Sequence, residues 1–352
     1  MHIEMILLKA GILIATALST ACTSRFGNGS IFNSDINSIN PSVHTDCYAS
    51  SAGSQRSERN KPEGNCEAFV FFTDPHLYPS TNSFDINYEW YRDNIPILLE
   101  VYNRLPSHFI MCGGDLINDF DTKQQAKSKL AYFVDAFKIE FDDFYIVAGN
   151  HDTNYLGDTY VNYRDSQSCM LSIEELEEIL FNGNKSYYSF DTAVTKNYCF
   201  NSGIDWDSNQ MNDFRWEQID WFARDLKNND KSHVSIFIHI ALFASTGKQL
   251  SEFMVNIGHI ISAFNEKSVV QLNDKVYDYS LCSGHIDFIQ AGHEHADVDG
   301  FMCGGVPVII TTTFSHPSVA TQPTFDYVYV DYDSMTVDCK RFGDGTDRVF
   351  FI

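Results

Sequence analysis

The segment DFYIVAGNHD, residues 143–152, runs an apolar strand directly into three polar residues, Asn150, His151 and Asp152. Four other apolar runs end in the same way, in the segments EAFVFFTDPH (67–76), HFIMCGGD (108–115), HVSIFIH (233–239) and HIDFIQAGHEH (285–295). Short, continuously apolar runs are typical of strands buried on both faces of a sheet. The pattern therefore predicts buried strands whose ends carry polar and ionisable side chains.

Helical patterns separate these strands. The segment SIEELEEIL (172–180) opens with a capping box of Ser172 and Glu175, which predicts a helix start. The amphipathic segment 213–229 predicts another helix, and in the helical segment 88–105 Pro96 predicts either a kink or the true start. Alternating strands and helices indicate an α/β fold.

The last part of the chain has strand patterns with no helix between them, in VPVIITTTF (306–314), FDYVYVDYD (325–333) and MTVDCKRF (335–342). This predicts a second, more antiparallel sheet, and the alternating segments 185–191 and 196–203 predict a hairpin. The expected architecture is an α/β sandwich of two mixed β-sheets flanked by helices.

The polar residues at the strand ends form the candidate site, because open α/β sheets bind ligands at the carboxyl ends of their strands. The candidate metal ligands are Asp74, His76, Asp115, Asn150, His239, His293 and His295. This mixed nitrogen and oxygen set suits Mn, Fe or Zn better than Ca or Mg. Seven ligands exceed the need of one tetrahedral ion, and they fit two ions that share a bridging carboxylate, as in phosphoester displacement.

Local spacing supports this grouping. Asp74 and His76, like His293 and His295, are two positions apart, which in extended backbone places both side chains on one face. Glycines precede Asp115, Asn150 and His293, where they permit sharp turns and close backbone approach.

With these motifs the chain resembles the calcineurin-like metallophosphoesterase superfamily over roughly residues 67–315. The matching elements occur in the family's order: D-x-H at 74–76, G-D at 114–115, G-N-H-D at 149–152, a lone His239, and G-H-x-H at 292–295. The resemblance implies a phosphoric ester hydrolase, either a phosphatase or a phosphodiesterase, on the metallophosphoesterase sandwich fold.

The resemblance also implies roles for the residues. One metal ion would be held by Asp74, His76 and His295, the other by Asn150, His239 and His293, and Asp115 would bridge the two. A metal-bridging hydroxide would attack phosphorus, and His151 would protonate the leaving oxygen. Many members orient that histidine with an Asp three positions after the bridging Asp, where this chain has Asn118 followed by Asp119. The orienting residue is therefore Asn118 or Asp119.

Departures from the family motifs disfavour two subclasses of metallophosphoesterase. Phe120 and Asp152 replace the residues typical of protein Ser/Thr phosphatases, and Asn118 replaces the tyrosine ligand of purple acid phosphatases. The resemblance leaves two other functions open, a non-catalytic binding module on the same fold and a nuclease, and the net charge of −23 disfavours the nuclease.

The charge of the chain restricts its partners. The 352 residues carry a formal net charge of −23, and an acidic surface repels the phosphate backbone of nucleic acids. The expected partner is a small-molecule or surface phosphoester. Nine cysteines include no C-x-x-C pair, which disfavours a cysteine zinc site and leaves disulfide pairing open.

The N-terminal residues 1–22 predict a signal peptide. The apolar run from Ala10 to Leu18 is too short to span a bilayer, and small residues before Cys22 are similar to a bacterial lipobox. Three interpretations stay open: a lipoprotein attached to a membrane through Cys22, a cleaved secretory signal, or an ordinary apolar N-terminus. The polar segment 23–65 predicts a flexible tether, and residues 66–352 the metallophosphoesterase domain, in an extracytoplasmic location.

Overall fold

The computed structural model describes residues 61–76, 85–118, 122–140, 143–154, 169–202, 209–242, 250, 252–314 and 322–352. The chain divides into Met1–Ala52 and Gly53–Ile352, and everything described below belongs to the second unit. The predicted signal peptide, the predicted tether up to residue 60 and Asp119 lie outside the described residues.

The first sheet has six strands in the order β14-β13-β12-β1-β2-β3. Its parallel part is β1 (Cys66–Phe72), β2 (Phe109–Cys112) and β3 (Phe144–Ile146). Its antiparallel part is β12 (Phe325–Asp331), β13 (Thr336–Phe342) and β14 (Arg348–Phe351). The first sheet is therefore mixed, with the fully buried β1 at the junction.

The second sheet has six strands in the order β10-β11-β9-β6-β5-β4. Its four central strands run parallel: β5 (Thr195–Phe200), β6 (His233–Ile238), β9 (His285–Ala291) and β11 (Val306–Ile310). The two edges are antiparallel: β4 (Tyr188–Asp191) and β10 (Val298–Cys303). The pairing of β4 with β5 confirms the predicted hairpin.

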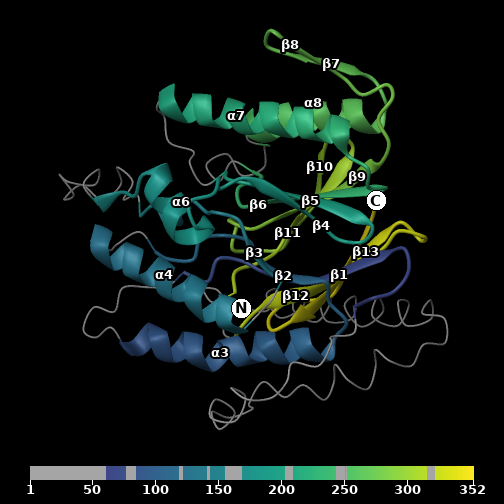
Figure 1. Ribbon diagram of the computed structural model, residues 1–352. Coiled ribbons are helices and arrows are strands. Elements are labelled where there is room, and N and C mark those ends of the chain that lie inside the picture. Colours follow the sequence, from purple (N-terminus) through teal and green to yellow (C-terminus); the bar gives the residue numbers. More distant parts are fainter. Residues whose placement is uncertain are drawn as a thin grey trace, which may run out of the picture. The chain divides into compact units, whose positions relative to one another are not determined.

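Helices cover the outer faces of the two sheets (Figure 1). The helices α3 (Asp85–Arg104) and α4 (Lys123–Glu140) lie beside the first sheet, and α7 (Asn209–Asp225) and α8 (Glu252–Asn265) lie beside the second. The helix α6 (Ile173–Phe181) starts with the predicted capping box, in which Ser172 and Glu175 bond reciprocally. The predicted α/β sandwich of two mixed sheets flanked by helices is confirmed.

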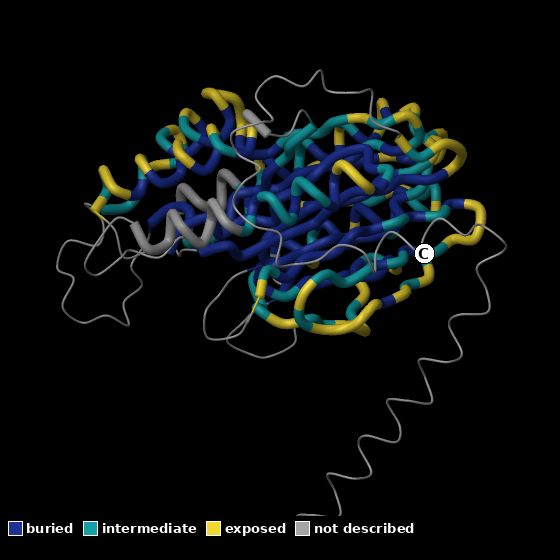
Figure 2. The backbone as a smooth tube through the Cα atoms, turned by 90° about the horizontal axis from the view of Figure 1, so that it is seen from below, coloured by how far each residue is buried: buried dark blue, intermediate teal, exposed yellow. Residues whose placement is uncertain are grey.

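Between the sheets lies an aromatic core. The ring of Phe69 stacks on Phe109 at 4.8 Å between centroids and meets the edge of Phe237 at 5.4 Å. All three side chains are buried, and Figure 2 shows the continuous buried interior of the strands. Close packing of large rings leaves the strands few alternative positions, so their ends are fixed relative to one another.

The structure corrects several details of the prediction. The C-terminal strands do not form a sheet of their own, because β12 pairs with β1 and β11 joins the second sheet. The physical reason is that buried β1 has β2 on only one edge, and its other backbone edge also requires hydrogen-bond partners. The helix α3 begins at Asp85 and continues through Pro96, so this proline does not mark its start.

Some elements had no sequence prediction. The helix α8 and a small hairpin of β7 (Val269–Leu272) and β8 (Lys275–Asp278) follow the second sheet's strand β6. The short 3-10 helices η3 (His151–Thr153) and η4 (Leu226–Asn228) complete the described elements. No helix among the described residues is long and apolar enough to cross a membrane. The free thiols within the described residues include Cys66, Cys112, Cys199, Cys282, Cys303 and Cys339.

A buried carboxyl group, Glu67 of β1, lies at the end of the strand opposite to the polar rim. Its partners are uncharged, with Asn197 Nδ2 at 3.4 Å from its Oε1. Burial raises the pKa of Glu67 from 4.5 to about 7, although hydrogen bonds from Thr195 and other neighbours oppose the shift. The folded protein therefore holds this proton more tightly than the unfolded chain does.

We expect Glu67→Gln to stabilise the protein selectively at high pH. The wild-type protein loses stability as pH rises between about 4.5 and 7, by an amount on the order of 3 kcal/mol, and the variant lacks this loss. Thermal unfolding of both proteins at pH 5 and pH 8 measures the effect, with the exposed Glu178→Gln as control. An equal difference in melting temperature at the two pH values would contradict the prediction.

Candidate metal centre

The predicted site residues follow the carboxyl ends of five parallel strands. Asp74 and His76 follow β1, Asp115 follows β2, Asn150 follows β3, His239 follows β6, and His293 and His295 follow β9. The strand ends of both sheets meet here, since six of these seven residues form two groups that could each hold a metal ion.

The first group contains Asp74, His76, Asp115 and His295. His76 Nε2 lies 2.8 Å from His295 Nε2, and both ring nitrogens face Asp74 Oδ1, at 3.6 and 3.2 Å respectively. Asp115 Oδ2 lies 3.8 Å from His76 Nε2. Two imidazole nitrogens and two carboxylate oxygens therefore converge, which is a suitable donor set for a transition metal.

The second group contains Asp115, His239 and His293. His239 Nε2 lies 3.0 Å from Asp115 Oδ2, and the two imidazole rings have centroids 5.2 Å apart. Asp115 is thus the one residue that belongs to both groups. Asn150 starts the turn that carries His151.

The buried atoms at this rim that make no hydrogen bond within the described residues include these four: Asp74 Oδ1, Asp115 Oδ2, Asn150 Oδ1 and His239 Nε2. Buried polar atoms without partners cost free energy, so such a cluster indicates groups whose partner is a ligand. All four atoms belong to predicted metal ligands, and each can donate an electron pair to a cation. The residues present therefore fit metal ions.

The orientation of His239 is set by the main chain. Its Nδ1 lies 2.7 Å from the carbonyl oxygen of Gly113, and because a carbonyl can only accept, Nδ1 carries the proton. In the neutral ring this leaves the lone pair on Nε2, the nitrogen that faces Asp115. A carbonyl partner that fixes the tautomer is common for metal-binding histidines.

The carboxylates give the rim a strongly negative potential. Burial opposes the charged form of His239, but Asp115 and Asp74 outweigh it and raise the pKa of His239 to about 10. Burial likewise opposes ionisation of Asp74, yet His239, His295 and His76 hold the pKa of Asp74 well below its ordinary value. The same potential that favours a protonated imidazole favours a metal cation.

Backbone conformation at the site differs from the prediction. Asp74, His76, Asp115, His293 and His295 all have positive φ, between 41° and 74°. The two-residue spacing therefore does not act through extended backbone, because each side chain instead projects from a residue of positive φ after its strand. Non-glycine residues seldom adopt this conformation, and its clustering is typical of functional sites.

Glycines allow the turns to approach one another. A Cβ atom on Gly149 would collide with the backbone nitrogen and carboxylate of Asp115. A Cβ atom on Gly292 would collide with the hydroxyl of Thr73 and come 2.7 Å from Asp74 Oδ2. The predicted close approach at these two glycines is confirmed.

Asp152 connects two of the turns. Its buried Oδ2 accepts hydrogen bonds from the backbone N–H groups of Gly149 at 2.7 Å and Asp115 at 3.1 Å, and its Oδ1 accepts from Leu116 at 2.7 Å. Burial, with a contribution from Asp115, raises the pKa of Asp152 to about 7. Asp152 thus connects the turn after β2 to the turn after β3 through these hydrogen bonds.

His151 lies beside both groups. Its backbone N–H donates to Asp115 Oδ1 at 2.8 Å, while its ring Nε2 lies 3.9 Å from Asp115 Oδ2. The side chain is 27% exposed, so a substrate has access to it. Asn118 is buried near the same turn and Asp119 lies outside the described residues, and both stay predictions as orienting residues for His151.

Sequence reasoning missed the residues that hold Asp74 in place. Thr73 Oγ1 donates to Asp74 Oδ2 at 2.7 Å, and Thr313 Oγ1 donates to the Asp74 carbonyl at the same distance. The His293 N–H also donates to Asp74 Oδ2, at 3.0 Å. The threonine directly before Asp74 was a signal in the sequence, whereas the contact with Thr313 depends on the tertiary structure.

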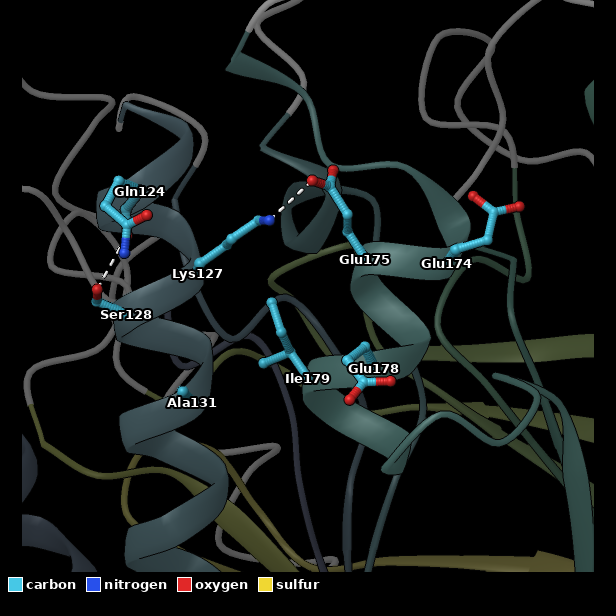
Figure 3. Close-up of a pocket in the computed structure, with 8 residues that line it drawn as sticks. All are labelled: Gln124, Lys127, Ser128, Ala131, Glu174, Glu175, Glu178 and Ile179. Atoms are coloured by element: carbon cyan, nitrogen blue, oxygen red, sulfur yellow. Dashed lines mark hydrogen bonds and ion pairs between the residues drawn. The ribbon is translucent and has the colours of Figure 1, made fainter.

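A separate groove lies between α4 and α6 (Figure 3). Its lining includes Lys127, Glu174, Glu175 and Glu178, and Lys127 bonds to Glu175 at 2.7 Å. None of the candidate metal ligands lines this groove.

Comparison with known proteins decides the family. The sequence profile of the calcineurin-like phosphoesterase family matches residues 68–297. The chain belongs to the calcineurin-like phosphoesterase family. The matched segment contains all seven candidate metal ligands and His151, which agrees with the resemblance carried by the motifs.

A solved structure supports the fold of this calcineurin-like phosphoesterase. A dimetal phosphatase from Danio rerio has a TM-score of 0.50 and 13% identity, over 81% of this chain and 98% of that chain. A purple acid phosphatase, PPD1 from yellow lupin (Lupinus luteus) seeds, has a TM-score of 0.48 and 12% identity, over 82% of this chain and 54% of that chain. The comparison with curated protein sequences gave no match.

The family and the two residue groups together point to a dinuclear metal site in this phosphoesterase. Asp115 is the residue that both groups share, and its role as a bridging ligand stays a prediction.

Proposed function

We propose that the protein is a metal-dependent phosphoester hydrolase, a phosphatase or phosphodiesterase, that uses two metal ions. The observation that carries the proposal is the pair of residue groups that share Asp115 at the joined strand ends of the two sheets. Two cations held by one carboxylate are suited to phosphoester displacement, in which both the attacking and the leaving oxygen need stabilisation.

The chain would hold the two ions with different sets of residues. Asp74, His76 and His295 would bind one ion, and Asn150, His239 and His293 the other, with Asp115 bound to both. When bound, the ions would activate water and neutralise charge that develops on the phosphoryl group. The donor set of imidazole, carboxylate and amide favours Mn, Fe or Zn.

His151 would donate the proton to the leaving oxygen. Its partly exposed ring lies at the edge of both groups, and its centroid is 5.0 Å from that of His76. An imidazole can exchange a proton near neutral pH, and proton donation to a leaving group contributes about 10²- to 10⁴-fold to a rate. Asn118 or Asp119 would orient the ring.

We propose a small-molecule or surface phosphoester as substrate, outside the cytoplasm. The net charge of −23 disfavours nucleic acid, and the N-terminal segment with Cys22 supports a secreted protein or a membrane-attached lipoprotein. In either case the enzyme would meet its substrate beyond the cytoplasmic membrane.

The test of this function combines metal content with hydrolysis. We expect about two metal ions per chain after dialysis against Mn²⁺, by analogy with dinuclear sites, and hydrolysis of p-nitrophenyl phosphate or bis-p-nitrophenyl phosphate. Diester preference would indicate a phosphodiesterase and monoester preference a phosphatase. Stoichiometric metal with no hydrolysis of either substrate, or no metal at all, would instead support the non-catalytic binding module.

A further inference from the structure

The C-terminal strands contain a buried pair of arginines. Arg341 on β13 and Arg348 on β14 both bind Asp326 of β12: Arg341 Nε lies 2.8 Å from Oδ1 and Arg348 Nη2 lies 2.7 Å from Oδ2. Arg341 and Asp326 are direct cross-strand partners in the sheet register. The two guanidinium groups carry two positive charges against one carboxylate, and a second acid is needed to balance them.

That second acid is Asp297, close to the metal-site turn after β9. Arg341 Nη2 donates to Asp297 Oδ1 at 2.6 Å, and Arg348 Nη1 lies 3.5 Å from the same oxygen. The Arg341 side chain is only 2% exposed, so little solvent screens its positive charge. The planar guanidinium reaches both carboxylates at once, which fixes the position of Asp297 relative to β12 and β13.

From Asp297 the contacts continue to a predicted metal ligand. Asp297 Oδ1 accepts the backbone N–H of Thr312 at 3.1 Å, and Thr312 Oγ1 donates to the carbonyl oxygen of His295 at 2.9 Å. His295 has a φ of 50°, a conformation that a non-glycine residue keeps only when surrounding contacts hold it. The hydroxyl of Thr312 provides such a contact directly at the strained residue.

We propose that Thr312, Asp297 and Arg341 are positioning residues that set the metal affinity of the first group through His295. This inference rests on the proposed function, because it assumes that the first group binds a metal ion. His293 is held independently, by its own hydrogen bond to Asp74 Oδ2. The effect of the positioning residues is therefore confined to one of the two ions.

Two of the three positioning residues, Thr312 and Arg341, lie outside the family match, which ends at residue 297. Thr312 follows β11, and Arg341 lies on β13. The C-terminal strands thus do more than complete the first sheet, since they hold the turn that presents His295 to Asp74 and His76.

The decisive variant is Thr312→Val, which removes the hydroxyl and preserves the shape of the side chain. Calorimetric titration of the metal-free full chain with Mn²⁺ is expected to show one ion bound about 10- to 100-fold more weakly and the other unchanged, the usual range for loss of an outer partner. Thr312→Ser keeps the hydroxyl and should restore wild-type binding. Arg341→Lys keeps the charge but loses the planar fork, and should weaken the same ion.

Thr195→Val is the matched control, because it removes a buried hydroxyl contact, to Tyr332, at the opposite end of the strands. Two results would overturn the positioning role. One is wild-type Mn²⁺ binding at both sites in Thr312→Val. The other is weaker binding of both ions, to the same extent in Thr312→Val and in Thr195→Val. A wild-type chain that binds no Mn²⁺ would overturn the proposed function itself, so the two failures are distinguishable.

Discussion

Replacing Asp115 with Ala is expected to abolish binding of both metal ions. Asp115 is the one residue shared by the two groups, and its Oδ2 lies 3.0 Å from His239 Nε2 and 3.8 Å from His76 Nε2. Removal of this carboxylate takes one donor from each group, and it also removes the negative charge that would offset the repulsion between two neighbouring cations. Hydrolysis should fall about 10³-fold or more, because metal ions contribute several kcal/mol to such reactions.

The measurement is metal content per chain after equilibrium dialysis, together with the hydrolysis rate. His76→Ala is the informative comparison, since His76 belongs only to the first group and its loss should spare one ion. Asp191→Asn, at an exposed position of β4, serves as the control for loss of a surface carboxylate. An Asp115→Ala protein that retains two tightly bound ions would refute the bridging role.

His151→Gln is expected to lower turnover about 10²-fold or more while metal content stays at the wild-type level. Metal should stay bound because the contact between His151 and Asp115 Oδ1 is made by the backbone N–H, which the substitution preserves. The lost function is the proton donor, so the deficit should grow with the basicity of the leaving group. A good leaving group such as p-nitrophenolate needs little protonation, whereas phenolate needs more.

Steady-state rates with p-nitrophenyl phosphate and phenyl phosphate therefore test the role of His151. The ratio of wild-type to variant rates should be larger for phenyl phosphate. His259→Gln, at an exposed position of α8, should leave both rates unchanged. A deficit of equal size for the two substrates would mean that His151 positions the substrate and does not donate the proton.

Much of the site was predictable because strand burial and strand ends are local properties of a sequence. Continuous apolar runs identify buried strands, and Asp115, Asn150 and His239 follow such runs directly. Parallel strands bring their carboxyl ends to one edge, so the ligands could be grouped before their positions were known. The same motifs were sufficient to indicate the family that the profile match then established.

The α/β class, the family and the candidate ligands could be predicted without the structure, since they depend on periodicity and on residue types at strand ends. The tertiary structure alone decided that β12 completes the edge of β1, that Gly113 fixes the ring of His239, and that Arg341 reaches Asp297. These contacts join segments that lie far apart in the chain. A local sequence pattern does not show which distant segment will supply the hydrogen-bond partner of a strand edge or ring nitrogen, or the ion-pair partner of a charged group. The positive φ angles at the ligands have the same origin, because only the assembled turns supply the contacts that hold them.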